Sequence, residues 1–208
     1  MKLIFATGNK GKLREAREIL EGYVDVVSPE ECGIYSEPEE TGVTLKENSL
    51  LKAEFFCARS GLDCFADDTG LEVDALGGAP GVHAARYAQD IARRDGLAEP
   101  PDHDFSANID ALLRELQKHP GEPRTARFRS VVTLICNGEP HFFEGTVEGH
   151  IAMQRSGTGG FGYDPVFIAD EYPHCSVAEL PEEVKNAISH RGKALRAMAQ
   201  WLKENNPV

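Results

Sequence analysis

The stretch TLKENSLLKAEFFCARSGLDCFADDTG, residues 44–70, decides the fold class. Thr44 followed three residues later by Glu47 makes a capping box, so a helix is expected over Thr44–Ser60. The short apolar run Leu62–Ala66 that comes next is typical of a buried strand. A helix that leads directly into a buried strand belongs to a β-α-β unit, which favours an α/β fold.

The residues before this stretch extend the same alternation. Apolar runs predict strands at Leu3–Ala6 and Val24–Val27, with a helix between them from about Gly11 to Leu20. The acidic segment 28–42 interrupts the pattern and is expected to be a loop. The first half is therefore β-α-β-α-β in order.

The second half changes its period. Helical spacing predicts a helix over Ile109–Lys118, and two β-rich runs follow at Phe128–Cys136 and His141–Ile151. Asn137-Gly138 between these runs favours positive φ and a hairpin turn. A last helix is expected over Glu182–Lys203, with Pro181 at its first turn, and the proline-containing segment 95–105 is expected to be an exposed loop. We therefore predict a mixed α/β fold whose sheet has both parallel and antiparallel strands.

Length and composition fit one large α/β domain or two small lobes, and we expect a single domain spanning residues 1–208. The chain has 208 residues, 41% of them hydrophobic and 27% charged, which is enough to bury a sizeable core. These values exclude disordered, collagen-like and coiled-coil proteins. The formal net charge of −12 argues against a nucleic-acid-binding protein, because such proteins hold the phosphate backbone with a broad basic surface.

Cysteine usage and hydropathy indicate a reducing compartment. The five cysteines are scattered and form no CxxC pair, which argues against a disulfide framework and a zinc site. The N-terminal apolar run is short for a signal peptide, and no window approaches 18 apolar residues. We expect a cytoplasmic protein with no membrane partner.

The first motif with chemical meaning is TGNKGK, Thr7–Lys12. It follows a predicted strand and opens a predicted helix, where backbone N–H groups and Lys12 could hold a phosphate. The spacing of Gly8 and Gly11 does not fit a Walker A loop. The alternative is an ordinary strand-to-helix turn with solvated lysines.

The second motif is Asp67-Asp68, which follows the predicted strand Leu62–Ala66. Ligands bind at the carboxyl ends of strands in open α/β sheets, and carboxylates there suit Mg²⁺. Because side chains alternate along a strand, only one of the two acids is expected to enter the site. The alternative is that both cap the following turn through Asx hydrogen bonds. Glu39-Glu40 offers a second carboxylate source from a loop, although taken alone these residues fit a solvated acidic run better.

Two later motifs could recognise a nucleotide. GTGGFGYDP, residues 157–165, is a glycine-rich loop that could present the rings of Phe161 and Tyr163 to a nucleobase. The alternative is that these rings only plug the loop. KNAISHR, residues 185–191, adds a basic group on the last predicted helix, and its alternative is a solvated basic face. The other histidines show no ligand spacing.

These strings together resemble the inosine triphosphate pyrophosphatase family, also called the Ham1-like family. The resemblance runs from Leu3 to Leu195 and rests, in order, on ATGNKGK, EETG with LKENSLLKAE, FADDTGLEVDALGGAPGVHAARYA, GTGGFGYDPVF and KNAISHRGKAL. It implies a mixed β-sheet flanked by helices, with two lobes and the active site in the cleft between them. It also implies a cytoplasmic, Mg²⁺-dependent homodimer that hydrolyses ITP, dITP and XTP to the monophosphate and pyrophosphate, which cleanses the nucleotide pool.

The resemblance also implies roles for particular residues. Glu40 and Asp68 would serve the metal, and Asp68 would be the catalytic residue. The substrate-binding residues would be Thr7, Gly8, Asn9, Lys10, Gly11, Lys12, Lys52, Thr69, Phe161, Gly162, Tyr163, Asp164, Lys185, His190 and Arg191.

The chain departs from the family pattern in three places. Thr69 stands where family members often have serine, which keeps the hydroxyl. QDIARRDGLAEPPDHDF, residues 89–105, replaces a glycine-containing segment, so contacts from that region are not transferred. Val184 occupies a position that is often acidic.

The chemistry of a triphosphate agrees with these roles. A triphosphate carries about four negative charges, so a chain of net charge −12 needs Mg²⁺ and local lysines to hold it. Asp68 would orient or deprotonate the water that attacks the α-phosphorus. The sequence leaves open which acid binds the metal and which acts as base. Donors from His190 and Arg191 would suit the O6 acceptor of a 6-keto purine and leave adenine unpaired.

Two other functions stay open from the sequence. The same phosphate-binding residues could serve an enzyme that hydrolyses pyrimidine triphosphates. A nucleotide-binding module without turnover is the non-enzymatic alternative, although acids facing a polyanion favour hydrolysis over mere binding.

Overall fold

The computed structural model describes residues 1–205 of the chain, which divides into two compact units. Unit 1 comprises residues 1–69, 130–146 and the segment from Ile188 onward. Unit 2 comprises residues 70–129 and 147–187. In the described residues no helix is long and apolar enough to cross a membrane.

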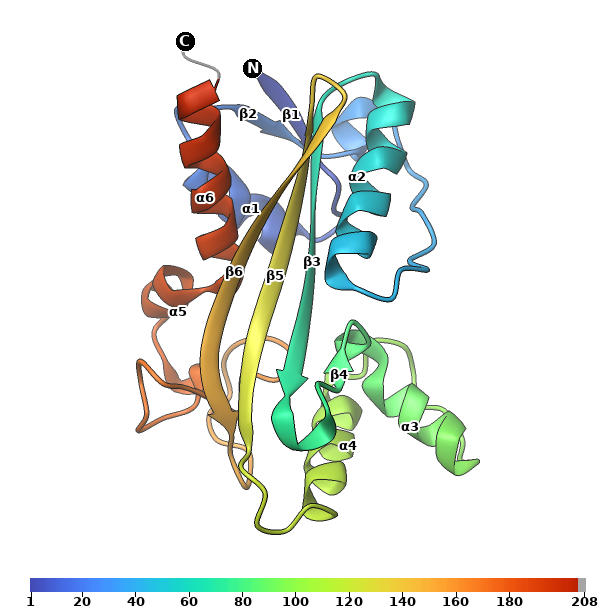
Figure 1. Cartoon of the computed structure of the whole chain (residues 1–208), viewed down its shortest axis with the longest axis vertical. Helices are drawn as coiled ribbons and strands as arrows, with labels where there is room; N and C mark the ends of the chain where they lie inside the picture. The colour runs from blue at the N-terminus through green and yellow to red at the C-terminus, as the bar shows by residue number, and fades with distance from the viewer. Residues whose placement is uncertain (206–208) are drawn as a thin grey trace. The chain divides into compact units, whose positions relative to one another are not determined.

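A mixed sheet runs through the chain in the strand order β2-β1-β3-β5-β6-β7, with β4 paired to β3 (Figure 1). Its strands are β1 (Lys2–Phe5), β2 (Asp25–Val27), β3 (Cys64–Val73), β4 (Pro80–Gly81), β5 (Thr125–Cys136), β6 (Glu139–Ile151) and β7 (Phe167–Ala169). In unit 1, β1 pairs in parallel with β2 and with β3. In unit 2, β3 pairs with β4 and β6 with β7 in antiparallel fashion. The predicted mixture of parallel and antiparallel strands is confirmed.

Helices cover both faces of the sheet in unit 1. The α-helices of the described chain are α1 (Lys10–Ile19), α2 (Leu45–Ser60), α3 (Tyr87–Asp95), α4 (Phe105–Gln117), α5 (Glu182–Ile188) and α6 (His190–Asn205). One core cluster joins α1 and α6 to β1, β3 and β5, with Phe5 stacked on Phe65 at 4.5 Å between ring centroids. A second cluster joins α2 to the other face of the same strands through Ile4, Ala53 and Cys64. In unit 1, α1 and α6 thus lie on one face of the sheet and α2 lies on the other (Figure 1).

Two predictions made from short sequence motifs are confirmed, the start of α2 and the turn between β5 and β6. Thr44 Oγ1 accepts the Glu47 N–H at 3.1 Å, and Glu47 Oε2 accepts the Thr44 N–H at 3.0 Å, which closes the capping box. Asn137 and Gly138 have φ of 52° and 82°, as a tight hairpin turn requires. The five cysteines are unpaired, as expected.

The strand predicted over Leu62–Ala66 is longer than expected. β3 continues without a break from Cys64 to Val73, so Asp67 and Asp68 lie inside it and not at its carboxyl end. Its parallel neighbour β1 stops at the Phe5–Phe65 pair. The two acids therefore lie just beyond the end of β1, while β3 itself continues into pairing with β4.

The predicted last helix is two helices. α5 ends at Ile188 and α6 begins at His190, so the helix over Glu182–Lys203 breaks at Ser189. The Ser189 hydroxyl accepts the Gly192 N–H at 3.0 Å, which is the bond an N-cap serine makes. The expectation of one continuous helix over Glu182–Lys203 is therefore wrong.

Unit 2 contains a helix that periodicity did not predict. α3 covers the first part of the segment 89–105, and α4 begins four residues earlier than the expected Ile109. The buried Asn108 side chain joins these elements, since it accepts the Ala88 N–H and donates to the Ala85 carbonyl, both at 2.8 Å. Short 3₁₀ helices at η1 (Glu30–Cys32), η2 (Asp74–Leu76), η3 (Ala84–Arg86) and η4 (Val177–Glu179) complete the described structure.

Candidate active site

The loop Thr7–Lys12, which was predicted to bind phosphate and is called the phosphate loop below, follows β1 and is held by hydrogen bonds from its own side chains. Asn9 caps α1, with its Oδ1 accepting the N–H groups of Gly11 at 2.9 Å and Lys12 at 3.1 Å. The Thr7 hydroxyl oxygen accepts the Asn9 N–H at 3.1 Å. These bonds fix the direction in which Lys12 leaves the first turn of α1.

Lys12 reaches from α1 to the strand that carries the paired acids. Its Nζ donates to both carboxylate oxygens of Asp67, at 3.1 Å and 3.0 Å. The Asp67 side chain is only 1% exposed, whereas that of Lys12 is 24% exposed. A residue predicted to bind phosphate is thus held in place by a buried carboxylate.

Arg191 uses the same carboxylate from α6. Its Nε donates to Asp67 Oδ2 at 2.8 Å and its Nη1 donates to Glu15 Oε2 at 2.9 Å. The Ser189 hydroxyl donates to the other Glu15 oxygen at 3.0 Å. Two cations predicted to touch substrate, Lys12 and Arg191, therefore converge on one buried acid.

Charge keeps Asp67 ionised in this setting. Burial alone would raise the pKa of its carboxyl, but the charges of Lys12 and Arg191 hold that pKa well below its usual range. Asp67 thus has a permanent negative charge that is balanced by its neighbours. Asp67 therefore positions the two cations and does not take up or release a proton near neutral pH.

Asp68 has different partners and a different charge state. Lys52 Nζ, from α2, donates to Asp68 Oδ1 at 3.1 Å and lies 3.2 Å from Glu40 Oε1. The other Asp68 oxygen, Oδ2, is buried and has no hydrogen-bond partner in the described part of the chain. Burial raises the pKa of Asp68 above its ordinary value, although Lys52 opposes the shift. Of the two adjacent acids, Asp68 is the one with an oxygen left for a ligand.

Thr69 and His190 complete the predicted residues of unit 1. The Thr69 hydroxyl donates to Ser130 Oγ at 3.2 Å. Burial lowers the pKa of His190 to about 3, so its imidazole is neutral at physiological pH. A neutral imidazole keeps one N–H donor and one acceptor, which suits recognition of an uncharged base edge.

The glycine-rich loop that was predicted to present aromatic rings to the base belongs to unit 2. Phe161 is 64% exposed and its ring centroid lies 4.3 Å from that of Phe105. Tyr163 is only 3% exposed and donates its hydroxyl hydrogen to the Ala84 carbonyl at 2.8 Å. Asp164 accepts the Phe161 N–H at 2.8 Å, which holds the loop. Only the Phe161 ring is presented to solvent, so the expectation that both rings face a ligand is wrong for Tyr163.

Gly162 and Lys185 lie in or near the same loop. Gly162 has a φ of 62°, which lets the chain turn between the two aromatic residues. Lys185 Nζ lies 3.5 Å from where a Cβ on Gly159 would be, so the lysine packs beside the glycine-rich segment. Gly162 and Lys185 therefore lie in or beside the same glycine-rich loop as Phe161.

Sequence reasoning missed several residues of unit 1 that build the site. Glu15 and Ser189 hold Arg191, and Ser130 holds Thr69. A Cβ on Gly145 of β6 would collide with the His190 carbonyl, so this glycine admits the start of α6. Glu15 lies three residues after Lys12 on one helix face, which was the one available signal. Nothing local marks the other residues.

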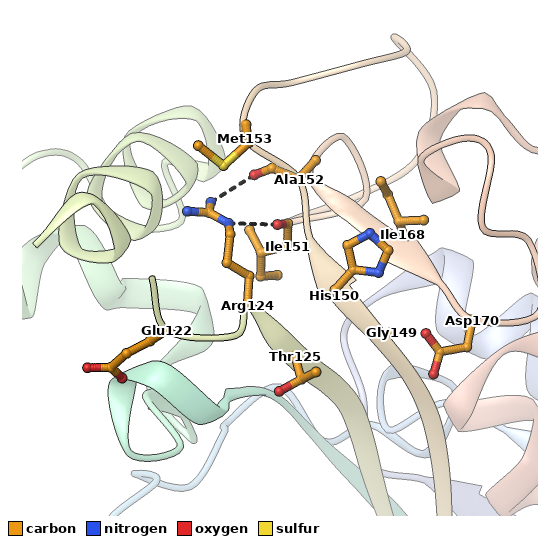
Figure 2. Close-up of a pocket in the computed structure, with 10 residues that line it drawn as sticks. All are labelled: Glu122, Arg124, Thr125, Gly149, His150, Ile151, Ala152, Met153, Ile168 and Asp170. Atoms are coloured by element: carbon orange, nitrogen blue, oxygen red, sulfur yellow. Dashed lines mark hydrogen bonds between the residues drawn. The ribbon is translucent and has the colours of Figure 1, made fainter. Parts of the chain in front are cut away.

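A cavity of about 600 Å³ in unit 2 contains none of the predicted residues (Figure 2). It is lined by Glu122, Arg124, Thr125, Gly149, His150, Ile151, Ala152, Met153, Ile168 and Asp170. The Arg124 guanidinium donates to the Ile151 and Ala152 carbonyls, both at 2.8 Å, so its donors hold the strand ends (Figure 2). Because this cavity contains none of the predicted residues, the charged groups of unit 1 are the better candidate for the active site.

The chain is similar to known proteins over almost its full length. It is 52% identical over 201 residues to a dITP/XTP pyrophosphatase of Porphyromonas gingivalis, covering 97% of each chain. Among solved structures, a HAM1 protein from Coxiella burnetii is 34% identical, with a TM-score of 0.87, and 98% and 99% of the two chains are covered. A nucleoside-triphosphatase, also named dITP/XTP pyrophosphatase, from Mycobacterium abscessus is 40% identical, with a TM-score of 0.76, and 95% and 98% of the chains are covered.

The family model agrees with these likenesses and with the order of the motifs. The model described as the Ham1 family matches residues 3–201. That range contains the phosphate loop, the paired acids of β3 and the cations at the start of α6. The chain belongs to the Ham1 family.

Proposed function

We propose that this chain hydrolyses dITP, XTP and ITP to the nucleoside monophosphate and pyrophosphate. The observation that carries the proposal is the contrast between the two adjacent acids of β3. Asp67 is neutralised by Lys12 and Arg191, whereas Asp68 keeps a buried oxygen without a partner among the described residues. The names of the relatives, dITP/XTP pyrophosphatase, supply the substrate class.

The donor set fits a magnesium ion. Asp68 Oδ2 is an orphaned carboxylate oxygen, and Lys52 brings Glu40 to the same place. No group of three or more His, Cys, Asp or Glu residues in the described chain forms a full metal cage. Mg²⁺ suits such a site, because it is usually held by one or two carboxylates together with substrate phosphates and water. When bound by Glu40 and Asp68, Mg²⁺ would neutralise phosphate charge and polarise the α-phosphoryl group.

Asp68 is the residue we assign as general base. Its raised pKa brings the carboxylate nearer to the range in which it can accept a proton from water. Lys52 holds Oδ1, which leaves Oδ2 directed to the ligand. Asp68 would then serve the metal through water. Oδ2 would accept the proton of the attacking water while the water oxygen bonds to the α-phosphorus and the bond from the α-phosphorus to the pyrophosphate leaving group breaks.

Lys12 would hold a phosphate of the substrate and Arg191 would contact the purine O6, both from fixed positions. Both cations are anchored on Asp67, so little side-chain entropy is left to lose when substrate binds. Lys10 and the Thr7–Lys12 backbone would add further contacts. Nε and Nη1 of Arg191 are already engaged, so a contact between Arg191 and the purine O6 would use its remaining nitrogen, Nη2.

Two side chains are proposed for base recognition, the exposed ring of Phe161 and the neutral imidazole of His190. Phe161 would stack on the purine, and stacking accepts any purine. His190 would contribute the hydrogen bond that distinguishes a 6-keto purine from adenine, since an unpaired partner in a dry pocket is costly.

Homodimer formation and a cytoplasmic location complete the proposal, and the five unpaired cysteines fit a reducing compartment.

The identity of the products tests this function. The protein is incubated with Mg²⁺ and ITP, XTP, dITP, GTP, ATP or dTTP, and phosphate and pyrophosphate are measured separately. ITP, dITP and XTP are expected to give the monophosphate and pyrophosphate in one step, with GTP, ATP and dTTP much slower. Accumulation of IDP with free phosphate would overturn the reaction, and preference for dTTP would overturn the substrate class.

A further inference from the structure

Asn48, on the first turns of α2, has one amide end bonded and one end without a partner. Its side chain is 1% exposed, and its Oδ1 accepts the Gly42 N–H at 2.8 Å. Because a backbone N–H can only donate, this bond fixes which end of the amide is oxygen. The other end, Nδ2, is buried and makes no hydrogen bond in the described residues.

The position of Asn48 connects it to the proposed metal acids. Asn48 and Lys52 are four residues apart on α2 and so lie on one helix face. Lys52 Nζ contacts Asp68 Oδ1 at 3.1 Å and Glu40 Oε1 at 3.2 Å. Asp68 Oδ2 is a second buried polar atom without a partner. An unbonded donor and an unbonded acceptor therefore lie on residues linked through α2 and Lys52.

The bonded end of Asn48 fixes the turn that carries Glu40. A Cβ on Gly42 would lie 2.9 Å from the Asn48 backbone nitrogen and still closer to its Oδ1. Only glycine lets the turn approach the helix this closely. Glu40 precedes Gly42 by two residues, so the bond between Gly42 and Asn48 limits where the Glu40 carboxylate can be.

We propose that Asn48 joins metal and substrate binding, an inference that rests on the function proposed above. Its Oδ1 positions the Glu40 turn, and its Nδ2 donates a hydrogen bond to a phosphoryl oxygen of the bound nucleotide. A buried donor without a partner destabilises the protein, so a ligand that supplies an acceptor restores the missing bond. An amide NH₂ group cannot coordinate a metal ion, which makes an anionic oxygen the matching ligand.

Three variants separate the two ends of the side chain. Asn48→Ala removes both ends. Asn48→Asp keeps an oxygen for the Gly42 N–H but has no donor for the nucleotide. Gly42→Ala pushes the turn off α2 and leaves the Asn48 donor intact.

Two binding measurements test the roles of Asn48 Oδ1 and Nδ2 separately, and neither depends on turnover. Electron paramagnetic resonance of free Mn²⁺ reports metal binding by the nucleotide-free protein. Isothermal titration calorimetry with the α,β-methylene analogue of ITP, in EDTA, reports nucleotide binding without metal. Asn48→Ala is expected to weaken nucleotide binding by about 10-fold or more, the loss typical of a hydrogen bond to a charged group. It is also expected to weaken Mn²⁺ binding, because the turn that carries Glu40 is no longer held by Asn48. Asn48→Asp is expected to retain Mn²⁺ binding and lose nucleotide affinity, and Gly42→Ala is expected to show the reverse.

Ser49→Ala provides the matched control. Ser49 is as buried as Asn48 on the same turn, but its hydroxyl is bonded to Thr133 Oγ1 at 2.7 Å and to the Lys46 carbonyl. Its loss is expected to lower the melting temperature without changing either affinity. If Asn48→Ala does not fold, Asn48→Asp still tests the donor, because it retains the bond to Gly42.

Unchanged nucleotide affinity in Asn48→Asp would overturn the donor role. Unchanged Mn²⁺ affinity in Asn48→Ala and Gly42→Ala would overturn the positioning role. Failure of the proposed function would look different, since the wild-type protein would then release phosphate from ITP, or turn over another nucleotide class, whatever the variants bind.

Discussion

Lys12 Nζ donates to both carboxylate oxygens of Asp67, at 3.1 Å and 3.0 Å, although the two residues are 55 positions apart in the sequence. The bond ties the first turn of α1 to the centre of β3. Arg191 binds the same carboxylate from α6, so three elements of unit 1 meet at one buried charge. The adjacent acids of β3 therefore differ in role, and substitution of each is expected to change a different quantity.

Asp67→Asn is expected to destabilise the protein. The substitution leaves Lys12 and Arg191 without their buried counter-charge, and breaking such a pair typically costs about 3–5 kcal/mol. KM for ITP should also rise, because both cations lose their fixed positions. Denaturant unfolding and steady-state kinetics measure the two effects. A variant that unfolds like the wild type would show that Asp67 does not anchor the two cations.

Asp68→Asn is expected to reduce turnover and to destabilise the protein less than Asp67→Asn, because Lys52 keeps its contact with Glu40. Burial already disfavours the charged form of this carboxyl, so a neutral side chain of the same shape fits its place. Loss of the general base should lower kcat by about 10²-fold or more. The comparison is made with Asp67→Asn under the same conditions. A kcat close to that of the wild type would remove Asp68 from the reaction.

Phe161→Ala and Tyr163→Phe are expected to have opposite signatures. The exposed Phe161 ring should contribute stacking worth about 1–3 kcal/mol to every purine triphosphate, with little effect on folding. Tyr163→Phe removes the hydrogen bond to the Ala84 carbonyl and should lower stability by about 1 kcal/mol. kcat/KM for ITP and ATP and thermal unfolding separate the outcomes. A larger loss of kcat/KM in Tyr163→Phe than in Phe161→Ala would reverse the assignment.

Stability is expected to fall as pH is lowered from 7 to 5, in part because of His190. The folded-state pKa of His190 is about 3, below the ordinary value of 6.5, so below pH 6.5 the unfolded chain binds a proton that the folded chain refuses. Each pH unit below that value should cost about 1.4 kcal/mol.

His190→Gln is expected to remove this contribution. Urea unfolding of wild type and variant at pH 7 and pH 5 gives the difference in slope. Imidazole nitrogen shifts measured by NMR should show a neutral His190 ring in the folded protein at pH 5. Protonation of that ring near pH 6 would contradict the burial argument.

Gly145→Ala is expected to disturb α6 from a position outside every motif. The added Cβ would meet the His190 carbonyl and lie 2.8 Å from the Ala194 nitrogen, so the start of the helix must move. Arg191 moves with it, and its bond to Asp67 should weaken. We expect a lower melting temperature and a higher KM for ITP. Thr146→Ala, one residue further along β6, serves as control and should leave KM unchanged.

The sequence by itself determined the features that depend on neighbouring residues. The bonds between Thr44 and Glu47 begin α2, and Asn137-Gly138 takes the positive φ values of a hairpin turn. The apolar runs also gave the β-α-β-α-β order and the mixed sheet. These features could be predicted because each is stabilised within a few residues along the chain.

The tertiary structure alone decided how the candidate site is built. β3 continues through Asp67 with β5 as its neighbour in the sheet and pairs with β4 at Leu71 and Glu72, and the last helix breaks because Ser189 caps α6 and bonds to Glu15. Arg191 lies 124 positions from Asp67 and 176 from Glu15 in the sequence. Spacing along the chain reports side chains three or four residues apart, and it carries no information about a carboxylate shared across such distances. Which acid is neutralised and which keeps an open oxygen follows from burial and charge, and only the folded chain brings these together.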